Sequence, residues 1–302
     1  MLHVTNGTSV SLAATGLGGE VLTWLDVLHE GPVPAGISDD ELRRVRALFL
    51  DTEWPGYASA ADDLARRDQA LGAHDEVVLW FEHDLFDQLQ LIQILDRLRH
   101  SRARLSMICI ERYLGMMSGD ELAALWPSRH VVADAERELA AAAWRAFRSS
   151  DPMDVQALLA RDTSALPFLE GALRRHLQQF PWMGNGLSRT ERQILYVLSN
   201  RPHTFHTLFP AEQQMEERIF MGDSSLRRYV RALAGCRAPL IREETRDEDG
   251  VYLLTDAGVE VLAGRADHIR LNGINRWLGG VHLIGSDSLW RWDEAAGTLR
   301  RR

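Results

Sequence analysis

Carboxylates and histidines gather directly after a strongly apolar segment of the sequence. After the apolar residues 76–81 come Glu82, His83, Asp84 and Asp87. Burying such groups is costly unless they are solvated, paired or bound to a metal. One functional interpretation is a general acid–base pair that uses Glu82 and His83 as catalytic groups. The other is a divalent-cation site, in which Asp84 and Asp87 act as ligands because residues three apart share one face of a helix.

The same residues also have a purely structural interpretation. Asp84 would cap the helix that follows, and Asp87 would favour the positive N-terminal end of that helix. His83 would then be a hydrogen-bonded histidine of the core. The His-Glu-x-x-His pattern of zinc proteases is absent, because no histidine stands four residues after His83.

A second polar group precedes a proline-rich loop. Asp26, His29 and Glu30 lie just before Pro32 and Pro34, which restrict the backbone of the loop. A histidine on a rigid loop is the best candidate for a general base, with Glu30 as its acid partner. Asp26 is a candidate ligand-binding residue. The alternative is that His29 only bonds backbone carbonyls.

A third polar group could hold an anion. Asn6, Gly7, Thr8 and Ser9 follow the first apolar segment. A strand, a glycine turn and a helix start would offer unpaired backbone N–H groups and two hydroxyls to an anion. Capping of the following helix by Thr8 or Ser9 is the structural alternative. Arg112, after another apolar segment, is a further candidate ligand-binding residue.

These polar groups lie where predicted strands end. Apolar segments predict strands at residues 2–5, 20–24, 76–81, 105–110 and 130–132, with helical segments between them. Strands that alternate with helices imply right-handed crossovers and an α/β fold, a Rossmann-like parallel sheet with helices on both faces. In such sheets, ligands bind beyond the carboxyl ends of the strands at a topological switch point. We therefore expect the three polar groups to converge in one cleft.

The remaining sequence predicts two further parts. The expected division is a Rossmann-like domain at 1–134, a helical connector at 135–186, and a winged-helix-like domain with a Trp-rich tail at 187–302. In the last part, Ser188 to Glu191 form a capping-box pattern, and Asp223 or Ser224 is expected to cap a third helix. The residues Asp247-Glu248-Asp249-Gly250 predict a hairpin turn between two strands.

Composition excludes several classes of protein. The chain has 302 residues, a formal net charge of -9 and 34 basic residues, all of them arginine. Without lysine there is no Schiff base, no pyridoxal-phosphate anchor and no P-loop lysine. Two cysteines far apart in sequence, Cys109 and Cys236, build neither a disulfide framework nor a zinc cluster. We expect a cytoplasmic protein, because no signal peptide and no apolar run of membrane-spanning length is visible.

Charge argues against DNA as a partner of the winged-helix-like domain. Arg227, Arg228 and Arg231 on its third helix are suitably placed for phosphate contacts. Between residues 188 and 264, however, twelve acidic residues outnumber ten arginines, and the expected hairpin turn is acidic. Phosphates would be repelled by this surface. A packing or dimerisation module is therefore the favoured interpretation, and a homo-oligomer remains open.

Several segments also carry a family resemblance. The segments 1–7 (MLHVTNG), 24–32 (WLDVLHEGP) and 80–84 (WFEHD) resemble the bacterial family called domain of unknown function 1835. The segments 185–192 (NGLSRTER) and 220–223 (FMGD) are similar to the C-terminal domain that often accompanies it. The resemblance implies that the two halves are a usual pairing. Thr8 stands where relatives are expected to have Asp, which puts the role of this turn in question.

Two functions follow as expectations. The first is a protein that binds a small anionic ligand in its N-terminal domain and performs hydrolysis or group transfer, assisted by a divalent cation. The second is a ligand-responsive transcription regulator that binds DNA through its C-terminal domain. An interaction scaffold without chemistry is the third and simplest alternative.

Overall fold

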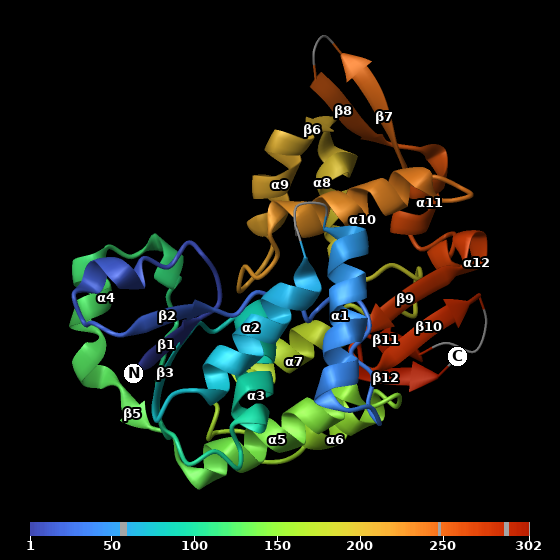
Figure 1. Ribbon diagram of the computed structural model, residues 1–302. Helices are drawn as coiled ribbons and strands as arrows, with labels where there is room; N and C mark the ends of the chain where they lie inside the picture. The colour runs from blue at the N-terminus through green and yellow to red at the C-terminus, as the bar shows by residue number, and fades with distance from the viewer. Residues whose placement is uncertain (55–58, 247–248, 287–289, 302) are drawn as a thin grey trace. The chain divides into compact units, whose positions relative to one another are not determined.

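The structure, a computed structural model, describes residues 1–54, 59–246, 249–286 and 290–301 (Figure 1). The chain divides into two units. The first comprises Met1–Leu173 and Gly279–Val281, and the second comprises Arg174–Leu278 and His282–Arg302. The boundary at residue 173 falls within helix α7 (Leu169–Leu177). The three-part division expected from the sequence stays a prediction.

A five-stranded sheet forms the centre of the first unit. Its strands are β1 (Leu2–Thr5), β2 (Glu20–Thr23), β3 (Glu76–Phe81), β4 (Arg104–Cys109) and β5 (His130–Val131). Their order is β2-β1-β3-β4-β5, and the first four are parallel. The predicted Rossmann-like α/β sheet is therefore present. Residues 77–81 of β3 are buried, as expected for a parallel strand in the interior of a sheet.

The edge strand β5 departs from the expected parallel sheet. It runs antiparallel to β4 and pairs through two residues, Ser106 with Val131 and Met107 with His130. Helix α4 (Gly119–Ala124), which precedes β5, has six residues and spans about 9 Å. The six residues of β4 span about 20 Å. Because α4 is too short to return the chain along β4, β5 starts from the carboxyl side and runs back.

Helices connect the strands and complete the first unit. The longer ones are α1 (Asp39–Glu53), α2 (Ala60–Gly72), α3 (Leu85–Arg97) and α5 (Asp134–Arg148), followed by the short α6 (Met153–Leu159). Helix α3 is buried over most of its length and packs against α5. Capping of a helix by Thr8 or Ser9 was a wrong prediction. The segment there is a single 3-10 turn, Leu12–Thr15, which begins after Ser11 without a side-chain cap.

Three residues from the C-terminal part of the chain belong to the first unit. The N–H of Val33 donates to the carbonyl of Gly279 at 2.9 Å, and the N–H of Gly280 donates to that of Phe147 at 2.9 Å. A Cβ atom on Gly280 would overlap the carbonyl of Arg148. Only glycine allows so close an approach of two backbones. The segment Gly279–Val281 is therefore built into the first unit.

The second unit begins with helices and a three-stranded antiparallel sheet. Its elements are α8 (Arg189–Asn200), β6 (His203–Thr204), α9 (Phe205–Gln213), α10 (Asp223–Gly235), β7 (Ile241–Arg246), β8 (Asp249–Leu254), α11 (Asp256–Leu262) and α12 (His268–Asn272). The sheet order is β6-β8-β7. The capping box at Ser188 is confirmed. Capping of α10 by Asp223 or Ser224 was a wrong prediction. Gly222 holds the cap position without a side-chain bond, because Asp223 is already helical.

The predicted hairpin turn lies partly outside the described residues, which omit Asp247 and Glu248. The tail forms two further hairpins, β9 (Ile274–Leu278) with β10 (Val281–Gly285), and β11 (Trp290–Asp293) with β12 (Thr298–Arg301). Trp292 is buried, and its N–H donates to the carbonyl of Pro181 at 2.8 Å. None of the helices in the described part of the chain combines the length and apolar character needed to cross a membrane.

A buried polar network lies in the second unit. The Arg175 guanidinium forms an ion pair with Glu216, with Nη2 and Oε1 2.7 Å apart. Nearby, Gln213 Nε2 donates to Glu212 Oε2 at 2.7 Å. Burial, and then the charge of Glu216, raise the pKa of Glu212 to about 7. Glu212 is therefore an acid whose ionisation opposes folding.

Candidate functional site

Polar residues meet where the strand order of the first unit reverses. From β1 the chain moves outward to β2 and then returns to β3 on the other side of β1. Asn6 follows β1, and Glu82 follows β3. Because β1 and β3 are parallel neighbours, both residues emerge at the same carboxyl edge. This is the topological switch point at which open α/β sheets bind ligands.

The start of α3 brings two further carboxylates to this edge. Asp84 caps the helix, with its Oδ1 accepting from the N–H of Asp87 at 3.1 Å. The capping interpretation of Asp84 is therefore confirmed. Asp87 turns back towards the strands. Its Oδ1 accepts from the N–H of Glu82 at 2.7 Å, and its Oδ2 accepts from Asn6 Nδ2 at 2.6 Å.

Glu82 is held by a turn that follows β4. Its Oε1 accepts from the N–H of Leu114 at 2.7 Å, and the N–H of Gly115 also bonds to it. A Cβ atom on Gly115 would lie 2.6 Å from Ser9 Oγ, so Ser9 packs directly on this turn. On α3, Gln88 Nε2 donates to the backbone carbonyl of Glu82 at 2.6 Å. Segments after β1, β3 and β4 therefore meet around one carboxylate.

Glu82, Asp84 and Asp87 form a compact cluster, called here the acidic triad. Each offers a carboxylate oxygen, and these oxygens lie within 4.8 Å of one another. The three residues are no more than 5% exposed. Among the residues that the structure describes, no arginine or histidine forms an ion pair with them. The negative charge of the triad is therefore not balanced by a basic side chain in that part of the chain.

This arrangement disfavours the ionised carboxylates. Burial, opposed by a backbone hydrogen bond and strengthened by the charge of Glu82, raises the pKa of Asp84 to about 7. Burial and the charges of the two neighbouring acids raise the pKa of Asp87 well above its ordinary value. The pKa of Glu82 is also raised by burial, although two backbone N–H groups bond to it. The raised pKa values therefore favour the protonated triad when no cation is bound.

The donor set fits a hard divalent cation. Three carboxylates from three residues offer oxygen atoms only, with the Asn6 side chain beside them. Oxygen ligands suit Mg²⁺, Mn²⁺ and Ca²⁺, whereas Zn²⁺ and copper favour nitrogen and sulfur. Cys109, bonded to the carbonyl of Glu82 at 3.6 Å, is no competing ligand, because burial raises its pKa to about 12. The thiolate form that binds metals is thus strongly disfavoured.

The two predicted histidines lie near the start of α3 but make different contacts. His29 is buried, and its Nε2 lies 3.6 Å from Glu30 Oε1. Its ring meets that of Phe86, in the first turn of α3, edge-on at 5.9 Å. The His83 ring lies 5.2 Å from the ring of Tyr113. His29 with Glu30 and His83 with Tyr113 are thus two separate candidate acid–base groups.

Other predicted site residues have structural partners. Asp26 is buried in an ion pair with Arg46, with Oδ1 and Nη2 2.7 Å apart. Arg46 also donates to the backbone carbonyls of Val27 and Glu30, so this pair fixes the loop that carries His29. Arg112 lies at the surface and pairs with Glu121 at 3.4 Å. The Asp26 carboxylate therefore helps to position the loop through Arg46, and its role as a ligand-binding residue stays a prediction.

The turn after β1 is only partly engaged in the site. Gly7 is half-buried and Thr8 is exposed, whereas Asn6 bonds to Asp87. Gln88 and Arg46 support the site although they are not among the residues predicted from the sequence. The sequence does indicate a buried role for Arg46, because this residue interrupts the apolar spacing of Leu42 and Leu50 on the buried face of α1. A charged residue on such a face requires a buried partner.

Comparisons with known proteins add no identification. No protein-family model matches the chain, and no curated protein matches it. The resemblance to the domain of unknown function 1835 family therefore stays a proposal that rests on the quoted motifs.

Proposed function

We propose that the first unit binds a divalent cation through the acidic triad and uses it to hold a small anionic substrate. The observation that carries this proposal is the group of three buried carboxylates without a basic partner among the described residues. A divalent cation would replace the protons that the metal-free triad favours. Its bonds to carboxylate oxygens would offset the cost of burying their charge.

The position of the triad supports an anionic substrate. Mg²⁺ in proteins is commonly bound by one or two carboxylates together with substrate phosphates. The triad lies at the switch point, beside the turn formed by residues 6–9. Asn6 and the hydroxyls of Thr8 and Ser9 are the groups of this turn that would orient the substrate.

The reaction class that fits is hydrolysis or group transfer. A bound cation would polarise the substrate and make a bound water more acidic. His29, oriented by Glu30, is the first candidate for the general base, and His83 is the second. The His29 ring contacts Phe86 in the first turn of α3, and His83 directly precedes Asp84, the N-cap of that helix.

Metal binding is tested first with Mn²⁺ alone, by isothermal titration calorimetry on the full chain. Asp87→Asn should weaken Mn²⁺ binding by about tenfold or more, because it removes one anionic ligand. Asp96→Asn is the matched control, since Asp96 lies on the same helix outside the triad. Circular dichroism establishes that each variant is folded, and Glu82→Gln provides a second test. Equal Mn²⁺ affinities for all variants, or no binding by the parent protein at millimolar Mn²⁺, would disprove the cation site.

The catalytic part has its own test. Once cation binding is established, a panel of phosphate esters is screened for Mn²⁺-dependent turnover. His29→Ala should lower kcat by about a hundredfold or more, the usual contribution of a general base. A joint His29→Ala and Glu82→Ala variant that retains turnover would remove both residues from the mechanism.

A DNA-binding regulator is the second candidate, because of the topology of the second unit. The order α8-β6-α9-α10-β7-β8, with the antiparallel sheet β6-β8-β7, supports a winged helix with α10 as its third helix. Arg228 and Arg231 lie on α10. Binding of duplex DNA should weaken linearly in log–log form as salt rises, and Arg231→Gln should reduce that slope by about one. No binding by the full chain at low salt would eliminate this function.

A further inference from the structure

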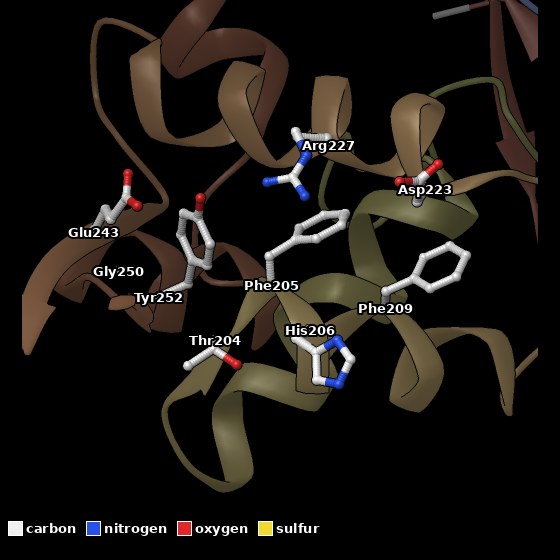
Figure 2. Close-up of a pocket in the computed structure, with 9 residues that line it drawn as sticks. All are labelled: Thr204, Phe205, His206, Phe209, Asp223, Arg227, Glu243, Gly250 and Tyr252. Atoms are coloured by element: carbon white, nitrogen blue, oxygen red, sulfur yellow. The ribbon is translucent and has the colours of Figure 1, made fainter. Parts of the chain in front are cut away.

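The second unit contains a pocket of about 590 Å³ between α9, α10 and the β7–β8 hairpin (Figure 2). This volume lies within the range of small-molecule sites, which is about 300–1,000 Å³. The walls are the aromatic rings of Phe205, Phe209 and Tyr252. Charged side chains of both signs share the pocket with these rings. The pocket belongs to the second unit alone and is distinct from the acidic triad.

Arg227 is the cation of this pocket. Its guanidinium carbon lies 3.7 Å from the centre of the Phe205 ring, and Figure 2 shows the guanidinium above that ring. Phe205 is itself stacked with Phe209, with centroids 6.2 Å apart. Within the described ranges, Arg227 forms no hydrogen bond or ion pair. Stacking thus fixes the plane of the guanidinium and leaves its N–H edges for a ligand.

The anions of the pocket lie apart from each other. In Figure 2, Asp223 is near Phe209, whereas Glu243 is beside Tyr252 at the other end. Asp223 Oδ1 accepts from the N–H of Ser224 at 2.8 Å. The Glu243 carboxylate lies over Gly250, where a Cβ atom would overlap it. Both carboxylates therefore have defined positions at the ends of the aromatic wall.

Three ligand classes can be compared with this pattern. A polyanion such as duplex DNA is repelled by Asp223 and Glu243, and a simple organic cation leaves the Arg227 guanidinium without a counter-charge. A neutral apolar compound would leave the Arg227 donors unpaired as it desolvates them. A zwitterion with an apolar body satisfies both signs of charge. Its carboxylate would accept from the guanidinium fork, which matches carboxylate geometry.

We propose that this pocket binds a free α-amino acid with an aromatic or branched apolar side chain. Arg227 receives the carboxylate, and Asp223 or Glu243 receives the ammonium group. The ligand side chain packs against Phe209 and Tyr252. This inference does not depend on the proposed function of the first unit.

Calorimetric titration of the full chain tests the proposal, with EDTA present to keep cations from the acidic triad. L-phenylalanine, L-tyrosine and L-leucine are the probes. Phenethylamine lacks the carboxylate, and 3-phenylpropionate lacks the ammonium group. We expect at least one amino acid to bind, and both analogues of phenylalanine to bind about tenfold or more weakly than phenylalanine.

Variants identify the residue that reads the carboxylate. Arg227→Gln should weaken amino-acid binding by about tenfold or more. The affinity of Arg227→Lys should fall between those of the parent protein and Arg227→Gln, because lysine keeps the charge but loses the guanidinium fork. Arg242→Gln is the control. Arg242 neighbours Glu243 in β7, but its side chain points to the opposite face and pairs with Glu244.

Several outcomes would overturn the proposal. These are the absence of binding by all three amino acids at millimolar concentration, binding of either analogue as tight as that of phenylalanine, and equal losses in Arg227→Gln and Arg242→Gln. Circular dichroism verifies that the variants are folded. Should Arg227→Gln fail to fold, the analogue comparison on the parent protein decides the question.

Discussion

Replacing Asp84 by Asn tests whether the acidic triad stores unfavourable charge in the metal-free protein. Asn caps helices about as well as Asp, so the start of α3 should be preserved. The substitution removes a carboxyl group whose pKa burial raises to about 7 from an ordinary value of 3.8. An acid with a raised pKa contributes stability below its ordinary pKa and loses that contribution as the pH rises through the raised value.

The structure sets the size of this effect. At 1.36 kcal/mol per pH unit, the interval from 3.8 to about 7 corresponds to at most about 4 kcal/mol. In the presence of a chelator, the free energy of unfolding of Asp84→Asn should therefore match that of the parent protein near pH 4 and exceed it near pH 8. The three acids titrate as a group, so the measured difference belongs to the triad and not to Asp84 alone.

Denaturant unfolding of both proteins at several pH values between 4 and 8 measures the difference. With Mn²⁺ in place of chelator the advantage of Asp84→Asn at high pH should shrink, because the ionised parent triad binds the cation and gains about 2.7 kcal/mol at a hundred times Kd. A stability difference in chelator that does not change with pH would refute the reasoning, since a solvated Asp84 would titrate alike in the folded and unfolded states.

Three further substitutions or reactions test other buried groups. Glu212→Gln should stabilise the protein by up to about 3 kcal/mol at pH 8 and not at pH 4, because the pKa of Glu212 is raised to about 7 from 4.5. Unfolding in guanidinium chloride measures this difference, and equal effects at both pH values would contradict the prediction. Asp26→Asn leaves Arg46 buried without its partner and should cost about 3–5 kcal/mol, read from the urea midpoint; a loss below about 1 kcal/mol would show that the pair is not buried in solution. At pH 8 a thiol reagent should modify Cys236 before Cys109, because burial raises the pKa of Cys109 to about 12. Peptide mapping by mass spectrometry measures the order of labelling, and faster labelling of Cys109 would be inconsistent with the structure.

Simple sequence patterns predict where the candidate site lies. The apolar run 76–81 predicts an interior strand, and the polar residues after it must then lie at the carboxyl edge. Asn6 follows another predicted strand, and parallel strands share that edge. Asp84 stands where a helix cap is needed. These inferences use only local patterns and the handedness of crossovers.

Other features depend on contacts between distant segments. Asn6 and Asp87 are 81 residues apart in the chain, and no local pattern specifies their hydrogen bond. The partner of Asp26 is a helical residue 20 positions away, so the local sequence around Asp26 does not indicate the ion pair. The direction of β5 follows from the length of α4, which sequence periodicity does not define to within a turn. The pocket around Arg227 needs α9, α10 and a hairpin together.

The segment Gly279–Val281 determines how this gene can be dissected. An expression clone that stops at residue 173 would encode the first unit without the β9–β10 turn, whose backbone bonds to Val33 and Phe147. Two backbone groups would lose their partners, and the surface beside Arg148 would be uncovered. A fragment of the second unit would keep those three residues, which connect β9 to β10, but without their partners in the first unit. Functional work on either half is therefore better done by point substitution in the intact polypeptide than by truncation.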